Sequence, residues 1–139
     1  MSAEYPMYAL SEEHHAIREA VRAVCDAKVA PNAAEVDESA EFPKVAYDAL
    51  AAADFTAPHI GEEYGGAGAD ALATCIVIEE IARACAATSL IPAVNKLGTM
   101  PIILAGSEEL KETCDPSRPG TRCSPTASPS RRRAPTRRR

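Results

Sequence analysis

The chain has 139 residues, which suffices for one domain around a single core. Hydrophobic residues make up 46% of it and aromatic residues only 4%, a balance that suits closely packed helices. The net charge of −5 combines two unlike parts, because residues 1–113 hold 7 basic and 19 acidic residues and residues 114–139 hold 8 arginines and one acid. No apolar run approaches the ~20 residues that a membrane span needs.

The five cysteines and the acidic N-terminus indicate a cytoplasmic protein. The cysteine number is odd, no Cys-x-x-Cys pair is present, and the three cysteines of residues 1–113 lie in apolar periodic stretches. We therefore expect these thiols to be small buried hydrophobes in a reducing compartment. The N-terminus MSAEYPMYALSEE shows no basic-then-apolar secretion signal.

The first half of the chain predicts three helices. Apolar residues recur at spacings of three and four from Leu10 to about Val29, which predicts a helix capped by Ser11 and stopped by Pro31. A short second helix is expected over residues 33–38. Pro43 suits the first turn of a third helix over residues 44–53.

The second half predicts a glycine-rich loop and further helices. Residues 55–70 contain four glycines and a proline and are expected to form the loop. Asp70 can cap a long, mostly apolar and therefore buried helix over residues 71–87. Two helices follow, over residues 89–98 and 99–106, closed by Gly98 and Gly106, and a last helix starts after Ser107. No long segment alternates with period two, so the predicted fold class is all-α.

Three motifs have a chemical interpretation and a structural one. EEYGGAG could bind a phosphate, but the segment before it is helical and Glu62 and Glu63 would repel an anion, so a structural turn is favoured. The histidines lack partners at metal-ligand spacing. Glu79 and Glu80 could suggest a carboxylate metal site, but such sites use Glu-x-x-His and position 83 is arginine, which favours an exposed or satisfied carboxylate.

The order of segments resembles the N-terminal helical domain of acyl-CoA dehydrogenases. The resemblance covers roughly residues 8–112 and is carried by LSEEHHAIREAVRAVCDAKVAP, FPKVAYDALAAADFTAPHIGEEYGGAG, IVIEEIARACAATS and NKLGTMPIILAGSEELKE. It implies a flavoprotein with two further domains, a middle β-domain and a C-terminal helical domain. In the family these two domains make most of the contacts to FAD, and the C-terminal domain supplies the catalytic glutamate. The glutamate removes the α-proton of an acyl-CoA while hydride passes from the β-carbon to FAD. In this family an electron-transfer acceptor reoxidises the flavin, and the enzymes are commonly homotetramers.

The resemblance carries over no catalytic residue and no flavin ligand to this chain, and no metal site is expected. It does imply that the helix TSLIPAVNKLG lines the far end of the acyl pocket, with Ser89, Ala93 and Leu97 facing inward at spacings of four. Met100 and Pro101 are secondary candidates. A small residue such as Ala93 leaves room for an acyl chain, and each misfit methylene is worth about 1–3 kcal/mol. Without the resemblance, Ala93 and Leu97 read as ordinary core residues.

The segment that follows residue 113 departs from the family, which continues toward a motif close to L-S-E-x-x-A-G-S-D. Here the chain reads CDPSRPGTRCSPTASPSRRRAPTRRR, rich in the residues that GC-rich DNA encodes out of frame. When the third base of each codon is joined to the next two, the genetic code allows residues 119–139 to read as GDAMFSYCLSEPEAGSDAAS. We therefore expect a frameshift near residue 113, a domain over residues 1–113 and a disordered, non-native tail over residues 114–139.

Two alternatives to an inactive enzyme fragment stay open from the sequence. The arginines 131–133 and 137–139 could neutralise nucleic-acid phosphates, but no aromatic residues lie between them and the acidic remainder opposes a polyanion. We expect no specific nucleic-acid partner and no membrane partner. The second alternative is a stand-alone helical interaction module without chemistry. On the main interpretation, the isolated chain does not retain FAD.

Overall fold

The computed structural model describes residues 9–114 and, within them, contains helices and no strand. The predicted all-α class is therefore confirmed for this part. The expected disordered tail covers residues 114–139; its first residue, Cys114, lies in a 3-10 turn (Glu112–Cys114) and is buried. Residues 115–139, with the arginines expected to bind nucleic acid in the alternative interpretation, lie outside the described residues. The α-helices are α1 (Glu12–Val24), α2 (Ala33–Ser39), α3 (Lys44–Ala52), α4 (Ala71–Ala84), α5 (Ala86–Ala105) and α6 (Glu108–Lys111).

Helix α1 begins where the sequence predicts but ends differently. The hydroxyl of Ser11 accepts a hydrogen bond from the backbone N–H of His14, and Glu12 and Glu13 follow in the positively polarised first turn. After Val24 the helix widens into a π-helical turn, Cys25–Val29, and then tightens into a 3-10 turn, Ala30–Asn32. Pro31 therefore redirects a continuous helical path into α2 instead of stopping it, because a proline near the start of a turn needs no N–H partner.

Helices α4 and α5 correct two predicted boundaries. The carboxylate of Asp70 caps α4 by accepting from the backbone N–H of Ala73 at 2.7 Å, as expected. However, α4 ends at Ala84, because Cys85 adopts an extended conformation. Beyond it, α5 runs unbroken through Gly98 to Ala105, and Gly106 is its C-cap residue. The prediction that Gly98 closes a helix was wrong, since the ~1 kcal/mol penalty of an internal glycine does not by itself interrupt a long helix.

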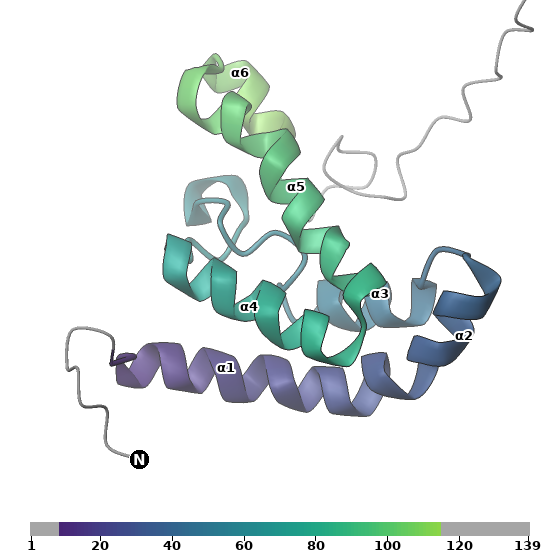
Figure 1. Cartoon of the computed structure of the whole chain (residues 1–139). Coiled ribbons are helices and arrows are strands. Elements are labelled where there is room, and N and C mark those ends of the chain that lie inside the picture. The colour runs from purple at the N-terminus through teal and green to yellow at the C-terminus, as the bar shows by residue number, and fades with distance from the viewer. Residues whose placement is uncertain (1–8, 115–139) are drawn as a thin grey trace, which may run out of the picture.

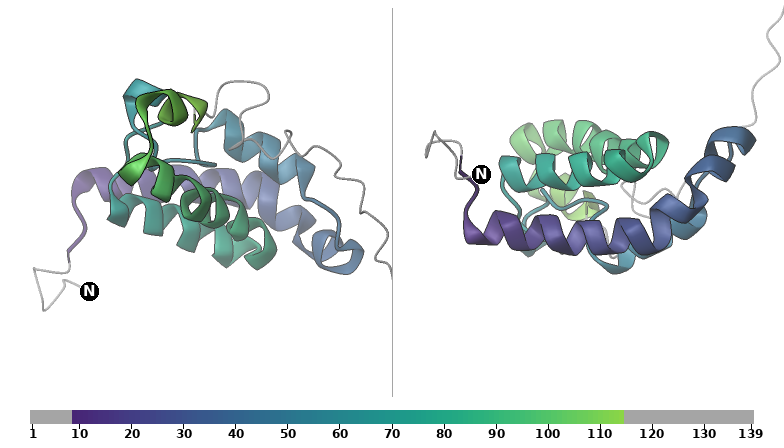
Figure 2. Two further views of the ribbon diagram at one scale, coloured as in Figure 1. Left: turned by 90° about the horizontal axis from the view of Figure 1, so that it is seen from above. Right: turned by 60° about the horizontal axis from the view of Figure 1, so that its bottom comes forward.

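The helices form a lower layer and a rising arm (Figure 1). Helices α1 and α4 lie side by side in the lower layer, and α3 lies behind them. Helix α5 packs on α4 along its first half and then rises away from the layer toward α6. Figure 2 shows the same arrangement from above and from below, with α2 at one end of the layer. The second half of α5 therefore stands clear of α1 and α2.

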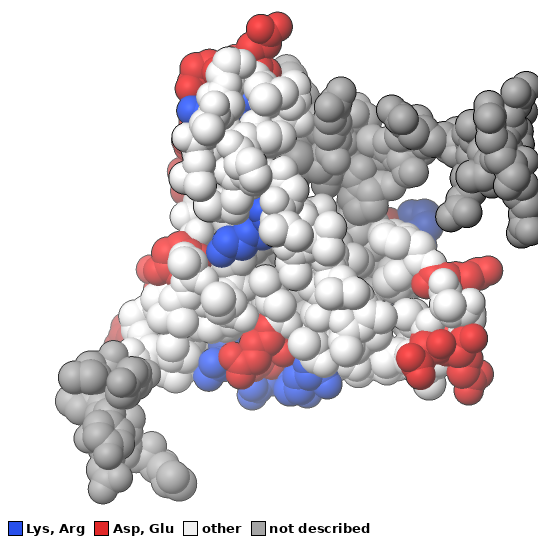
Figure 3. Space-filling model, turned by 45° about the horizontal axis from the view of Figure 1, so that its top comes forward, with Lys and Arg blue, Asp and Glu red and all other residues white. Residues whose placement is uncertain are grey.

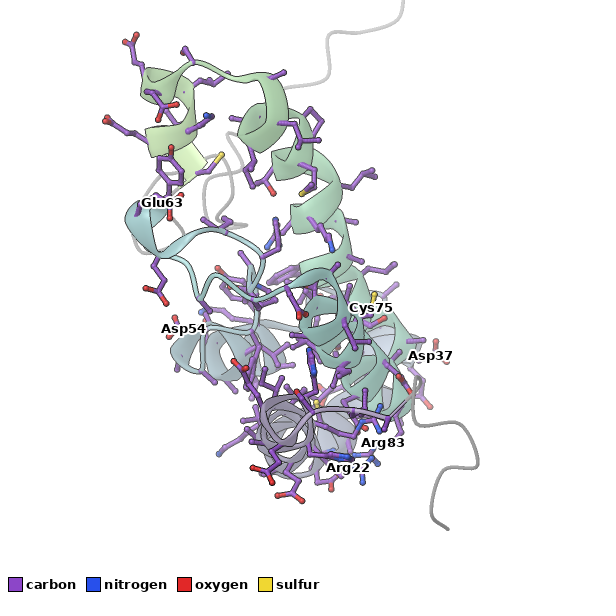
Figure 4. All side chains as sticks on the ribbon, turned by 90° about the vertical axis from the view of Figure 1, so that its left-hand side faces the viewer. Arg22, Asp37, Asp54, Glu63, Cys75 and Arg83 are labelled. Atoms are coloured by element: carbon purple, nitrogen blue, oxygen red, sulfur yellow. The ribbon has the colours of Figure 1, made fainter. Side chains whose placement is uncertain are left out.

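The main core fills the space between α1, the turns after it, α3 and α4. Its buried members are Val21, Cys25, Val29, Ala46, Leu50, Val77, Ile81 and Cys85. Burial raises the pKa of the Cys25 thiol to about 11, so this cysteine is an inert core residue, as expected. Cys75 corrects that expectation, because it lies on the open side of α4 and is exposed. Figure 4 shows it pointing outward from the helix, which is covered by α1 and α5 on its other sides.

A cluster of ion pairs ties α1 to α4 beside this core. The carboxylate of Glu80, whose side chain is only 4% exposed, accepts from Arg22 at 2.6 and 3.0 Å and from Arg83 at 3.1 Å. Arg83 also donates to Asp26 at 2.6 Å. Arg22 and Arg83 lie together at the junction of the two helices in Figure 4. Glu80 is thus a satisfied carboxylate, which agrees with the structural interpretation of the Glu79–Glu80 pair.

The loop before α4 folds back on itself through its own backbone. Gly66 donates its N–H to Gly61, Gly68 donates to Ile60, and Ala69 donates to Pro58, at 2.8 to 3.1 Å. A second buried cluster of Ala57, Ile60 and Cys114 lies under this loop, flanked by Tyr64, Ile102 and Ile103. The backbone of the loop therefore satisfies its own polar groups and holds the loop against the rising arm.

Replacing Glu80 tests the ion cluster. We expect Glu80→Gln to lower the free energy of unfolding by about 1–2 kcal/mol at pH 7, because charge-assisted hydrogen bonds weaken while solvent screens the half-exposed arginines. Urea unfolding followed by circular dichroism measures the change. The matched control is Glu79→Gln, whose 70% exposed side chain lies 3.7 Å from Arg18 and which should change stability by less than about 0.5 kcal/mol.

The stability difference between wild type and Glu80→Gln should depend on pH. Hydrogen bonds from Arg22 and then Arg83 hold the pKa of Glu80 below its ordinary value of 4.5, against the opposing effect of burial. Because the folded-state pKa is lowered, the stability that the Glu80 carboxylate contributes is fully present above pH 4.5 and is lost as the pH falls through the folded-state value. The stability difference between wild type and Glu80→Gln should therefore shrink below pH 4.5. A difference that stays constant down to the acid transition would contradict this account.

Two glycine substitutions test the loop and the long helix. A Cβ at position 66 would overlap the backbone carbonyl of Ile60, so we expect Gly66→Ala to destabilise the domain by about 2 kcal/mol or more. A Cβ at position 98 would meet no atom within 4 Å among the described residues, so Gly98→Ala should stabilise it by about 0.5–1 kcal/mol. Thermal unfolding should give a lower midpoint for Gly66→Ala and a higher midpoint for Gly98→Ala than for wild type. Equal losses of stability in the two variants would contradict this prediction.

Candidate functional site

The rising half of α5 presents an open, apolar groove. It is lined by Ala93, Lys96, Leu97, Met100, Pro101, Leu104 and Ala105. Leu97 is 75% exposed and Ala93 is half-buried at its edge. Two of the three residues that the sequence assigns to an acyl pocket thus lie on one surface, together with Met100 and Pro101, the secondary candidates.

Ser89, the third of these residues, lies elsewhere on α5. It is 8% exposed, and its hydroxyl donates to the backbone carbonyl of Ala86 at 2.7 Å. A spacing of eight residues turns an α-helix by roughly 80° beyond two full turns, so Ser89 and Leu97 diverge although each successive step of four is small. Within the described residues the structure does not bring Ser89 into the groove. Its assignment to an acyl pocket stays a prediction.

A hydrogen-bond relay fixes α5 against the loop of residues 55–70. The imidazole Nε2 of His59 lies 2.6 Å from the hydroxyl of Thr99, and that hydroxyl donates to the carbonyl of Asn95 at 2.7 Å. The side-chain amide of Asn95 donates in turn to the carbonyl of Thr56 at 2.9 Å. The relay lies on the side of α5 opposite the groove and holds the helix from behind.

His59 is the residue of this region that sequence reasoning missed. Burial, and then the nearby Lys96 ammonium, hold its pKa below the ordinary value of 6.5, so the ring is neutral at pH 7. Its Nδ1 atom is buried and has no hydrogen-bond partner in the part of the chain that the structure describes. No local spacing pairs His59 with Thr99, 40 residues away. The partner could be found only from the fold.

A second concavity lies between α1, the start of α4 and the loop. Its volume is about 320 Å³, and its walls include Glu13, His14, Ile17, Asp54, Phe55, Pro58, Asp70 and Val77. The Nε2 atom of His14 lies 3.2 Å from the Asp70 carboxylate. The backbone hydrogen bond from Ala73, followed by that from His14, lowers the pKa of Asp70. The carboxylate is thus engaged in capping α4 and in orienting His14, two structural roles.

The backbone geometry of the loop of residues 55–70 decides between the phosphate-binding and the structural interpretation of EEYGGAG. The backbone N–H groups of Gly65, Gly66 and Gly68 are bonded to carbonyls within the loop, so they do not converge on an anion. The structural turn that the sequence favours for EEYGGAG is what the structure contains. Residues 9–114 hold no group of three or more His, Cys, Asp or Glu side chains placed to bind a metal ion.

None of the helices between residues 9 and 114 is both long and apolar enough to cross a membrane.

Comparison with known proteins identifies the domain. Residues 11–117 match the family model for the acyl-CoA dehydrogenase N-terminal domain. The "Probable acyl-CoA dehydrogenase FadE25" of Mycobacterium tuberculosis is 58% identical over 113 residues, which are 81% of this chain and 29% of that protein. The cyclohex-1-ene-1-carbonyl-CoA dehydrogenase of Syntrophus aciditrophicus is 40% identical over 106 residues, 76% of this chain and 26% of that protein.

A third relative carries a different name. The 3-(aryl)acrylate reductase of Clostridium sporogenes is 38% identical over 103 residues, which cover 73% of this chain and 27% of that protein. The chain thus spans less than a third of the length of the curated relatives it matches. The family match covers more than half of the chain and includes every described helix. By this match and by its all-helical structure, the chain belongs to the acyl-CoA dehydrogenase family, whose N-terminal domain it contains.

Proposed function

We propose that this domain forms one wall of the acyl pocket in an enzyme that introduces an α,β double bond into acyl-CoA thioesters. The observation that supports the proposal most strongly is the 58% identity to an acyl-CoA dehydrogenase across 113 residues. Acyl-CoA is then the substrate, an electron-transfer acceptor is the partner, and the chemistry belongs to the longer enzyme. The domain contributes the shape of the pocket and no reacting group.

The apolar groove on α5 is the candidate wall. Leu97 and Leu104 expose 75% and 76% of their surface there, and Ala93 adds only a methyl group at the edge. An acyl chain laid against this surface would bury apolar carbon at about 25 cal/mol per Å². Lys96 is the one charged residue that borders the groove. The groove therefore favours a hydrocarbon chain over a charged substituent at this end of the substrate.

FAD is the cofactor that the family implies, and residues 9–114 do not fit it. A flavin pyrophosphate needs converging backbone N–H groups or a cluster of cations, and the N–H groups of the one glycine-rich loop are bonded within the loop. The arginines of α1 and α4 are paired with Glu80 and Asp26. We therefore derive no catalytic step through flavin in these residues and assign its binding to the remainder of the family enzyme.

The first test of this proposal is the flavin content of the purified 139-residue chain. We expect no absorbance near 450 nm after expression in riboflavin-rich medium, and no reduction of an artificial acceptor with butyryl-CoA or octanoyl-CoA. The physical reason is that the described residues offer no flavin cradle. A yellow protein that reduces the acceptor with either thioester would overturn the proposal that this chain is inactive by itself.

The division of the chain at residue 113 is the second part of the proposal. Residues 1–113 then form the family domain, and residues 114–139 are read out of frame after a frameshift near Glu112–Cys114. Support comes from the change of composition and from the shifted frame, which can read LSEPEAGSD. Cys114, the first residue of the segment 114–139, is buried in the cluster with Ala57 and Ile60, and residues 115–139 lie outside the described residues.

Sequencing the gene from the Lys111 codon to several hundred bases past the stop tests the division. We expect that one inserted or deleted base restores a long open frame that begins near LSEPEAGSD and encodes a further helical domain. Such a frame would assign the dehydrogenase activity to the restored enzyme. A frame that stays closed in all phases would refute the frameshift and make the arginine-rich tail a genuine part of the protein.

A further inference from the structure

The loop of residues 55–70 holds the arm, which we define as residues 95–114, through a polar and an apolar contact. In the polar contact, the Nε2 atom of His59 lies 2.6 Å from the hydroxyl of Thr99, a residue that is 2% exposed. The apolar contact encloses Cys114, which is 1% exposed in a cluster shared with the loop. This cluster has no buried residue in common with the main core between α1, α3 and α4. The arm and the main core are therefore held by separate contacts.

The half-buried imidazole of His59 is suited to this contact in its neutral form. Its Nδ1 atom is buried and has no hydrogen-bond partner in the part of the chain that the structure describes. An imidazolium carries an N–H on both ring nitrogens, so the protonated ring has a buried Nδ1–H without an acceptor, whichever nitrogen carried the first proton. A buried donor without an acceptor and a buried charge both cost free energy. Protonation of His59 therefore disfavours the closed arm.

The charged groups around this contact do not offset the cost. The Lys96 ammonium on α5 opposes a positive charge on His59, and it follows burial as a cause of the lowered His59 pKa. On α6, Glu108 accepts from Lys111 and from Tyr64 of the loop, and these two bonds hold its pKa below 4.5. Figure 3 shows acidic side chains at the tip of the arm and a mostly uncharged surface along it. The other carboxylates of the loop and of residues 108–114 are exposed and accept no hydrogen bond from His59: Glu62, Glu63, Asp70, Glu109 and Glu112.

We propose that His59 is an acid-sensitive latch, whose protonation releases the arm from the loop while the main core stays packed. Above pH 6.5 the ring is neutral whether the arm is closed or open. As the pH falls below 6.5 the open arm, with its hydrated ring, takes up protons first, because burial holds the pKa of the closed arm lower. The stability that the neutral ring gives the closed arm is thus fully present above pH 6.5 and is lost as the pH falls toward the closed-state pKa.

The cysteines of the complete 139-residue chain report this release when a brief pulse of dipyridyl disulfide labels them. Cys114 becomes reactive when the arm opens, whereas Cys25, 0% exposed in the main core, becomes reactive only when the whole domain unfolds. The exposed Cys75 corrects for the pH dependence of the reagent and of a free thiol. Peptide mass spectrometry separates the three sites. The readout is the labelling rate of Cys114 divided by that of Cys75.

We expect this ratio to rise roughly three- to tenfold from pH 7.5 to pH 5.5, while Cys25 stays protected, because a free imidazole one pH unit below its pKa is protonated in about tenfold excess. His59→Gln keeps an amide beside Thr99 but does not titrate, so its ratio should not change with pH. Lys96→Glu places a carboxylate where the ammonium opposes protonation and should reduce the rise. The matched control is His15→Gln, an exposed histidine of α1, which should leave the rise unchanged.

Three results would overturn the latch. They are a wild-type ratio that does not change with pH, a parallel rise at Cys25, which means global unfolding, and a rise that persists in His59→Gln. Labelling of Cys25 at neutral pH reveals whether His59→Gln fails to fold, and an undiminished rise in Lys96→Glu would then overturn the latch instead. The release rests on contacts within residues 55–114 and requires no part of the proposed reaction, so either proposal can fail alone.

Discussion

The contact between α1 and α4 is the constraint on which the rest of the domain depends. Val21 and Cys25 from one side meet Val77 and Ile81 from the other, and all four are fully buried or nearly so. The carboxylate of Glu80 lies beside this apolar contact and joins arginines of both helices. Since α5 follows α4 after a single residue, its direction is set by the same contact.

Helix α5 is well packed in its first half and partly exposed in its second half. The first half of α5 lies on α4, and the relay from His59 through Thr99 and Asn95 ties the helix to the loop. Beyond Gly98 one side of the helix still packs on the loop through Thr99, Ile102 and Ile103, while Pro101 and Leu104 on another side are exposed. These exposed apolar side chains are therefore available to another surface, such as the acyl chain of the proposed function.

The polar groups of the described residues are engaged mostly with one another. The arginines of α1 and α4 are paired with Glu79, Glu80 and Asp26, and the glycine-rich loop bonds to itself. Within residues 9–114 the glycine-rich loop therefore offers no converging N–H groups to a phosphate, and under the proposed function this domain shapes a pocket while the base comes from the rest of the enzyme. This division of labour is consistent with relatives that are more than three times as long as the matched segment.

The sequence by itself determined the helical class, the family and most helix starts, because caps such as Ser11, Asp70 and Ser107 act within one turn. Periodicity also marked the side of α1 that is buried. The sequence misjudged Gly98, because the penalty of a single internal glycine is too small to interrupt a long helix, and Pro31, because a proline near the start of a turn needs no N–H partner. Helix periodicity alone already separates Ser89 from Leu97 by roughly 80°. Only the tertiary structure decided that Cys75 is exposed and that His59 meets Thr99, because these depend on how segments distant in sequence pack together.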